Sequence, residues 1–246
     1  LGVAEARRGL GLIDYWRAEY LSALDHFQAG LDAARQAAND ARQVRMLLAR
    51  GDCLMEVGRP ADAHGEIGAA LRIAEATNRP DLLARVHLAL LLFHTWSGPP
   101  ESARHHRDQA VRIAEGLGNL GLSCAVHWGA SVFSGLTGDA AGMARHLEAA
   151  TALAEELRSP LHRLRVAEPM IEYLASTGEW SRAVDLAERT IDTARALGQR
   201  SSLARLLVWA GLLRIGRGEI PIARAYIDKA WELSGAGRLD RQPDVH

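Results

Sequence analysis

The chain has 246 residues, of which 48% are hydrophobic and 24% charged, and this composition excludes a disordered tail, a collagen and a disulfide-stapled mini-protein. Its 29 basic and 30 acidic residues give a net charge of -1, which excludes the broad positive field of a non-specific nucleic-acid or membrane-surface binder. With two cysteines and no recognisable secretory signal, we expect a protein of the reducing cytoplasm. Since its first residue is Leu1 rather than Met, we expect it to be a piece of something larger.

An internal repeat of 40 residues predicts the elements in chain order. One column of the repeat holds Ala18, Gly58, Gly98, Gly138, Gly178 and Gly218. Glycine tolerates the left-handed conformation that commonly ends a helix. Residues suited to a helix start follow this column, namely Pro60, Pro100, Asp139 and Pro221. Each repeat therefore reads as a helix, a turn at this column and a second helix.

Looser connections separate the repeats, and each contains residues that interrupt a helix. They are Asn39-Asp40, Asn78-Arg79-Pro80, Gly118-Asn119, Ser159-Pro160 and Gly198-Gln199. Within the second helices, small residues recur on one helical face, where a neighbouring helix can approach closely. Since one helical hairpin cannot bury its apolar face alone, six antiparallel pairs must stack. The sequence predicts an all-α fold, with a single solenoid over residues 1–236 and a polar tail over residues 237–246.

Repeat two carries the clearest version of a known pattern, in Leu47, Gly51, Leu54, Gly58, Ala63, Ile67 and Ala70. This pattern resembles the tetratricopeptide repeat (TPR), and the resemblance extends over residues 1–236. It implies a right-handed superhelical solenoid of six antiparallel helix pairs. Repeats three to five depart from the family pattern, because the first-helix glycine is replaced by Leu91, Ser131 and Ile171. In repeat three, Arg107 also replaces a bulky apolar residue.

Four arginines share one column near the start of the first helices: Arg45, Arg85, Arg165 and Arg205. In tetratricopeptide arrays the first helices usually line the concave groove, so the resemblance places this column inside the groove. A row of guanidinium groups there can bind carboxylates or phosphates through paired hydrogen bonds. The alternative is that these arginines are solvated and paired with neighbours such as Glu168 or Glu172.

Aromatic residues form the second candidate binding site: Tyr15, Trp16, Trp96 and Trp128. The family register places them on or near the same groove, beside Leu48, Leu88, Leu92, Val132 and Leu136. Together these residues predict an apolar floor that suits an amphipathic helix or a flat ligand. Aromatic residues at helical spacing also pack in cores, which is the role expected for Trp180, Trp209 and Trp231.

The sequence offers little for catalysis or metal binding. His87 and His127 share a column and are expected to pack between helices, and Cys53 and Cys124 are expected to be small core residues. Pro169 falls within a first helix and is expected to kink it. No GxSxG, HExxH or phosphate-binding GxxxxGK(S/T) motif is present. We therefore expect no metal, no cofactor and no enzymatic activity.

We expect a non-catalytic module that binds a peptide segment, a partner protein or a small effector in its concave groove. The long period and the alanine- and arginine-rich composition resemble the sensor arrays of bacterial LuxR-type and other ATP-dependent transcriptional regulators. This likeness implies a part of a larger regulatory protein. The alternative is a structural adaptor or self-assembly module, for instance a homodimer, acting through the array end near Trp231 and Leu233. We expect no membrane insertion and no direct contact with nucleic acid.

Overall fold

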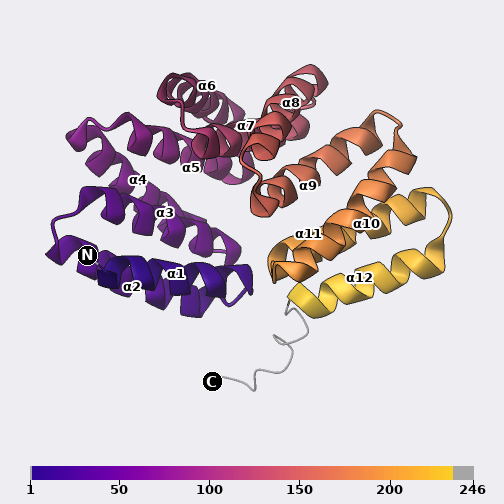
Figure 1. Ribbon diagram of the computed structural model, residues 1–246, viewed down its shortest axis with the longest axis horizontal. Coiled ribbons are helices and arrows are strands. Elements are labelled where there is room, and N and C mark those ends of the chain that lie inside the picture. Colours follow the sequence, from indigo (N-terminus) through magenta and orange to yellow (C-terminus); the bar gives the residue numbers. More distant parts are fainter. Residues whose placement is uncertain (1, 235–246) are drawn as a thin grey trace. The chain divides into compact units, whose positions relative to one another are not determined.

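The structure is a computed structural model that describes residues 2–234, and over that range it contains helices and no strand. The helices are α1 (Gly2–Trp16), α2 (Tyr20–Gln36), α3 (Asp40–Glu56), α4 (Pro60–Thr77), α5 (Pro80–Ser97), α6 (Pro100–Leu117), α7 (Leu120–Leu136), α8 (Ala140–Glu156), α9 (Pro160–Ser176), α10 (Trp180–Ala196), α11 (Arg200–Gly216) and α12 (Ile220–Ser234). Consecutive helices form antiparallel pairs (Figure 1). The predicted all-α solenoid of helix pairs is confirmed. The predicted polar tail, residues 237–246, lies outside the described residues.

The turn column adopts the expected conformation at four of its five glycines. Gly58, Gly138, Gly178 and Gly218 have φ angles between 74° and 85°, in the left-handed region that ends a helix. For Gly98 the prediction is wrong, because its φ is -138° and its ψ is -178°. Pro99 follows it, and a residue before proline is pushed into extended backbone.

Helix starts follow the predicted signals. Proline is the first residue of α4, α5, α6 and α9, where its missing N–H costs no hydrogen bond. The carboxylate of Asp139 accepts a hydrogen bond from the backbone N–H of Gly142 at 2.8 Å and so caps α8. Asn39 and Asn119 cap α3 and α7 in the same way. The residues of the turns and connections thus help to fix where these seven helices begin.

Within the hairpins, a small residue on one helix compensates for a large residue on the other. A Cβ added to the first-helix glycine would lie 3.2 Å or less from its partner in three pairs: Gly11 with Phe27, Gly51 with Ile67, and Gly211 with Ile227. In repeat five the sizes are exchanged, since Ile171 and Ala187 occupy these columns and both are fully buried in one core cluster. This departure from the tetratricopeptide pattern therefore preserves close packing.

The remaining core predictions concern single residues. Cys53 and Cys124 are buried thiols, as expected, and burial raises the pKa of Cys53 to about 12. Pro169 is buried inside α9, which continues through it. None of the helices over residues 2–234 is long and apolar enough to cross a membrane.

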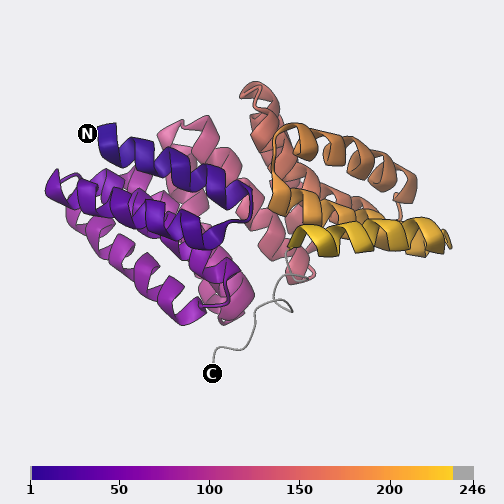
Figure 2. The same ribbon diagram turned by 90° about the horizontal axis from the view of Figure 1, so that it is seen from below.

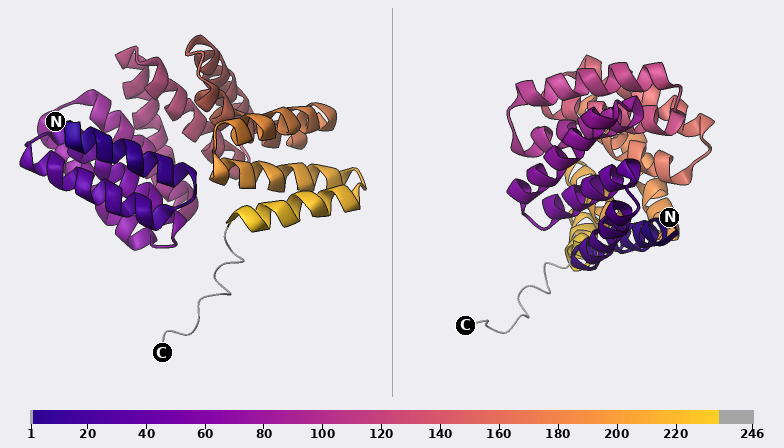
Figure 3. Two further views of the ribbon diagram at one scale, coloured as in Figure 1. Left: turned by 60° about the horizontal axis from the view of Figure 1, so that its bottom comes forward. Right: turned by 90° about the vertical axis from the view of Figure 1, so that its left-hand side faces the viewer.

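The described residues divide into two compact parts, an N-terminal part of residues 2–15 and 19–157 and a C-terminal part of residues 16–18 and 158–234. In the N-terminal part the first helices α3, α5 and α7 approach one another, whereas the second helices α4, α6 and α8 do not. The first helices therefore lie on the inner, concave side of this part. In the C-terminal part α9 and α11 approach each other, and α11 and α12 lie side by side (Figures 2 and 3). A single continuous array over residues 1–236 stays a prediction.

Candidate functional site

The candidate site is a set of four arginines on three first helices of the N-terminal part, which we call the arginine group: Arg8 on α1, Arg42 and Arg45 on α3, and Arg85 on α5. Glu5 on α1 is the carboxylate that faces the group. It lies 2.7 Å from Arg8 Nη2 and 3.8 Å from Arg42 Nε. The hydrogen bond from Arg8, with the charges of Arg45 and Arg42, holds the pKa of Glu5 below its ordinary value.

Arg85 has more arginines than carboxylates near it. Burial lowers the pKa of its guanidinium, and the charges of Arg45 and Arg8 lower it further, while Asp81 opposes them. The Nε of Arg85 is buried without a hydrogen-bond partner in the described chain. Asp81 is engaged by Arg79, whose Nε and Nη2 donate to it at 3.0 and 2.9 Å. Over residues 2–234, no carboxylate lies within ion-pair distance of Arg45 or Arg85.

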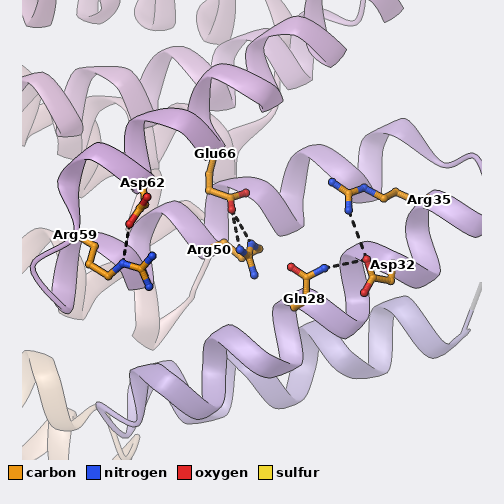
Figure 4. A network of polar contacts seen from close by, with 7 residues as sticks. All are labelled: Gln28, Asp32, Arg35, Arg50, Arg59, Asp62 and Glu66. Atoms are coloured by element: carbon orange, nitrogen blue, oxygen red, sulfur yellow. Dashed lines mark hydrogen bonds and ion pairs between the residues drawn. The ribbon is translucent and has the colours of Figure 1, made fainter.

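Some arginines of the N-terminal part are neutralised by nearby carboxylates (Figure 4). Arg50 on α3 donates from Nε and Nη2 to one oxygen of Glu66 on α4, at 3.1 and 2.7 Å. Arg59 pairs with Asp62 at 2.6 Å beside the turn between the same two helices. The arginine group therefore differs from these ordinary ion pairs.

The other two predicted arginines, Arg165 and Arg205, lie in the C-terminal part. The Nε of Arg205 donates to a carboxylate oxygen of Glu168 at 2.8 Å. Glu172, one turn further along α9, is half buried, and its pKa is raised by burial and by the charge on Glu168. The interpretation of a solvated arginine paired with Glu168 is therefore correct for Arg205.

The residues at equivalent positions of the repeat explain why Arg205 pairs with a carboxylate whereas Arg45 and Arg85 do not. The Arg205–Glu168 pair joins positions 37 residues apart. The equivalent pairs of positions in the N-terminal part are Arg85 with Leu48 and Arg45 with Arg8. Where the C-terminal part has a carboxylate, the N-terminal part has a leucine or a further arginine. The excess of positive charge thus depends on two columns of the repeat, that of Arg45 and Arg85 and that of Arg8 and Leu48.

The predicted aromatic residues have different surroundings. The ring centroid of Tyr15 lies 5.5 Å from that of Tyr20, in an edge-on contact between α1 and α2. Trp96, near the end of α5, is 63% exposed, whereas Trp16 and Trp128 are half buried. These positions do not by themselves define a common binding surface.

The leucines expected beside them take part in helix packing. A Cβ on Gly129 of α7 would lie 2.6 Å from Leu88 and 3.6 Å from Leu92 of α5. This glycine lets α7 approach α5 closely, and the two leucines fill the space between the helices. An apolar groove floor built from the aromatic residues and these leucines stays a prediction.

Two histidine pairs lie between the helices of hairpins α5–α6 and α7–α8. The Nδ1 atoms of His87 and His106 are 3.0 Å apart, as are those of His127 and His146. One nitrogen of each pair donates to the other. Burial is the main cause that lowers the pKa of His106 and of His146 to about 4, so both pairs are neutral at pH 7. The expectation that His87 and His127 pack between helices is confirmed, but their partners were missed although both lie 19 residues further on.

The arginine group can bind an anion. A guanidinium stays charged and presents a planar set of donors that matches carboxylate and phosphate oxygens. Residues 2–234 contain no cluster of three or more His, Cys, Asp or Glu side chains that could hold a metal ion.

Comparisons with known proteins bear on the fold. No family model and no curated protein matches the sequence. Among solved structures, the Rap conjugation gene regulator of the plasmid pLS20 in complex with the Phr* peptide is similar over 100% of this chain and 66% of its own, with a TM-score of 0.77 and 15% identity. A Rap protein complexed with competence and sporulation factor is similar over 95% of this chain and 64% of its own, with a TM-score of 0.76 and 14% identity. BtubC from P. vanneervenii is similar over 95% of both chains, with a TM-score of 0.63 and 16% identity.

These similarities define a class by its fold. The chain is a TPR-like helical repeat protein. It spans 64% and 66% of the length of the two Rap proteins, and at such low sequence identity the likeness concerns the arrangement of helices alone.

Proposed function

We propose that the chain is a non-catalytic binding module whose inner surface captures an acidic segment of a partner protein or peptide through the arginine group. The observation that carries this proposal is the set of guanidinium groups on α1, α3 and α5 with too few carboxylates to neutralise them. Like charges gathered in one place repel one another. An anion that binds among them relieves this repulsion, so the group favours an acidic ligand.

The extent of the group favours a segment with several carboxylates. Its residues come from three successive first helices, and packed helices are about 8–10 Å apart. Each guanidinium can hold one carboxylate through two parallel hydrogen bonds. A chain of acidic side chains can engage several arginines at once, whereas a small effector must carry widely separated anionic groups to do the same.

We further propose that the module is the sensing part of a larger bacterial regulatory protein. The resemblance to the sensor arrays of LuxR-type regulators supports this context, and two structures of similar fold are peptide or factor complexes of Rap proteins. In the reducing cytoplasm, where we place the protein, Cys53 and Cys124 remain thiols.

A titration with a labelled oligoglutamate peptide tests the proposal. The unmodified chain should bind this probe but not its oligoglutamine analogue, and the affinity should fall as ionic strength rises. The double variant Arg45→Gln/Arg85→Gln should bind about a hundredfold more weakly, because each charge-assisted contact contributes about 1.5 kcal/mol.

The matched control is Arg59→Gln, which removes an arginine that Asp62 already neutralises. This variant should bind the probe like the unmodified chain. Circular dichroism and urea unfolding should give the same helix content and stability for all three proteins. If the folded double variant keeps the affinity of the unmodified chain, the arginine group is not the binding site.

A second function, docking through the C-terminal array end, is favoured by Trp231. The packing role expected for this residue is wrong, because its side chain is 61% exposed, whereas Trp209 does pack against the core. We propose that Trp231 contributes to a docking surface of an adaptor or self-assembly module. Trp231→Ala should then abolish docking without affecting the oligoglutamate titration.

A further inference from the structure

We infer that Glu5 is an internal competitor of the acidic ligand. Its carboxylate already engages Arg8 and Arg42. The ligand is thereby restricted to the other two members of the arginine group, Arg45 and Arg85. The inference rests on the proposed function and deepens it, since Glu5 determines which arginines of the group a ligand reaches.

Glu5 is held in the same way as a ligand carboxylate in the proposed function. Arg8 lies three positions further along α1, and its Nε and Nη2 are 2.8 and 2.7 Å from the same oxygen, Oε1 of Glu5. The second oxygen, Oε2, lies 3.8 Å from Nε of Arg42 on α3. One protein carboxylate thus engages arginines of two helices. A guanidinium that donates to one carboxylate in this way has fewer donors left for another.

The carboxylate at this position is particular to the first repeat. Elsewhere the column of Glu5 holds Arg45, Arg85, Ala125, Arg165 and Arg205. Three positions after this column, the first repeat has Arg8, whereas the second and third repeats have Leu48 and Leu88. The first repeat therefore has a carboxylate in the arginine column and an arginine beside it, which pairs with that carboxylate.

The two remaining arginines keep the charge that attracts a ligand. Over the described residues, no carboxylate lies within ion-pair distance of Arg45 or Arg85. Burial lowers the pKa of Arg85 most, and the charge of Arg45 lowers it further. The two arginines occupy the same column on α3 and α5, which approach each other. They can hold two carboxylates of one segment, and further carboxylates add little while Glu5 engages the other arginines.

Removal of the Glu5 charge should leave the fold intact. The side chains of Glu5, Arg8 and Arg42 are all partly exposed. Ion pairs of this kind contribute little to stability, because water solvates the same groups and two long side chains must be held in one geometry. A change in ligand affinity can therefore be measured without a change in folding.

Titration of Glu5→Gln with the labelled oligoglutamate peptide tests the inference. This variant keeps the size and polarity of the side chain and removes its charge, so that Arg8 and Arg42 become available to the ligand. It should bind the peptide about tenfold more tightly than the unmodified chain. In a series of peptides with increasing numbers of glutamates, its affinity should go on rising beyond the length at which that of the unmodified chain levels off.

Two further variants test whether the gain comes from the arginines that Glu5 engages. Glu5→Gln/Arg8→Gln should lose most of the gain, because one of the released guanidinium groups is then missing. Glu5→Arg, which continues the arginine column, should bind the peptide at least as tightly as Glu5→Gln. Circular dichroism should show equal helix content for all variants.

The matched control is Asp62→Asn, which removes the same charge from a carboxylate that also pairs with an arginine three positions away, Arg59. It should bind the peptide like the unmodified chain. The inference is overturned if Glu5→Gln gains no affinity, if Asp62→Asn gains as much, or if the affinity of Glu5→Gln levels off at the same peptide length. The proposed function still stands in these cases if Arg45→Gln/Arg85→Gln weakens binding, and both fail if neither the unmodified chain nor Glu5→Gln binds the peptide.

Discussion

The two parts of the chain carry the same arginine column but differ in what faces it. In the C-terminal part Arg205 donates to Glu168, whereas Leu48 occupies the equivalent of that glutamate for Arg85. The first arrangement is a surface ion pair of the kind that contributes little. The second leaves a half-buried guanidinium among like charges. Whether an arginine of this column is paired with a carboxylate therefore depends on the residue that a second column places opposite it.

The same contrast appears between helices of the hairpins. Histidine pairs join α5 to α6 and α7 to α8 in the N-terminal part. At the equivalent positions the C-terminal part has Ala167 with Leu186 and Leu207 with Tyr226. One backbone arrangement thus accepts a polar contact in one part and apolar contacts in the other. Each difference can be tested by moving residues of one part into the other.

The largest expected effect comes from exchanging a packing pair. Gly51→Ile forces a branched side chain against Ile67, and overpacking of this kind costs about 2 kcal/mol or more. Ile67→Ala leaves a cavity and costs about 3 kcal/mol. The double variant reproduces the Ile171–Ala187 pair of repeat five and should lose less stability than the sum of the two single changes. Urea unfolding measures all three, and strictly additive losses would contradict the proposed exchange of sizes.

A smaller effect is expected from giving the arginine group the missing carboxylate. Leu48→Glu reproduces Glu168 of the C-terminal part and should pair with Arg85. Affinity for oligoglutamate should fall about tenfold, since one guanidinium is then occupied and the net charge of the group is lowered. Leu48→Gln is the matched control, because it changes size and polarity without charge. Equal losses in the two variants would mean that packing, rather than charge, sets the affinity.

The fold was predictable because periodicity determines it. Columns of glycine and alanine recur with the repeat, and their spacing specifies helix pairs whatever residues lie between them. Gly98 was mispredicted because Pro99 acts on a backbone angle that the column does not encode. Repeats three to five keep the fold because a small residue such as Ala187 compensates for a large residue such as Ile171. Predicting this compensation from the sequence requires knowing which two columns meet.

The candidate site was predictable only in part. Arg45 and Arg85 could be found from their column, but Arg8 and Arg42 lie outside that column and join the group because both lie near Glu5. Charge excess depends on distances between side chains of different helices, which a column does not give. The histidine partners were missed for the same reason, although the recurring separation of 19 residues between His87 and His106 is visible in the sequence.

The smallest expected effect is a dependence of stability on pH that is concentrated in the N-terminal part. The folded pKa of His106 and of His146 is about 4, below the ordinary value near 6.5, so the unfolded chain binds more protons between these values. Stability is full above about pH 6.5 and falls as pH decreases toward about 4, by about 1 kcal/mol for each pair after allowance for partial exposure.

Hydrogen exchange at about pH 7 and pH 5 measures this effect helix by helix. Protection should fall more in α5 to α8 than in α10 to α12, while α9 contains His162, whose pKa is also lowered, mainly by burial. The double variant His127→Ala/His146→Leu copies the Ala167–Leu186 pair and should remove the loss from α7 and α8 while leaving that of α5 and α6. A loss that persists in α7 and α8 of this variant would show that other groups cause it, and the contrast between the two parts would then not arise from the histidine pairs.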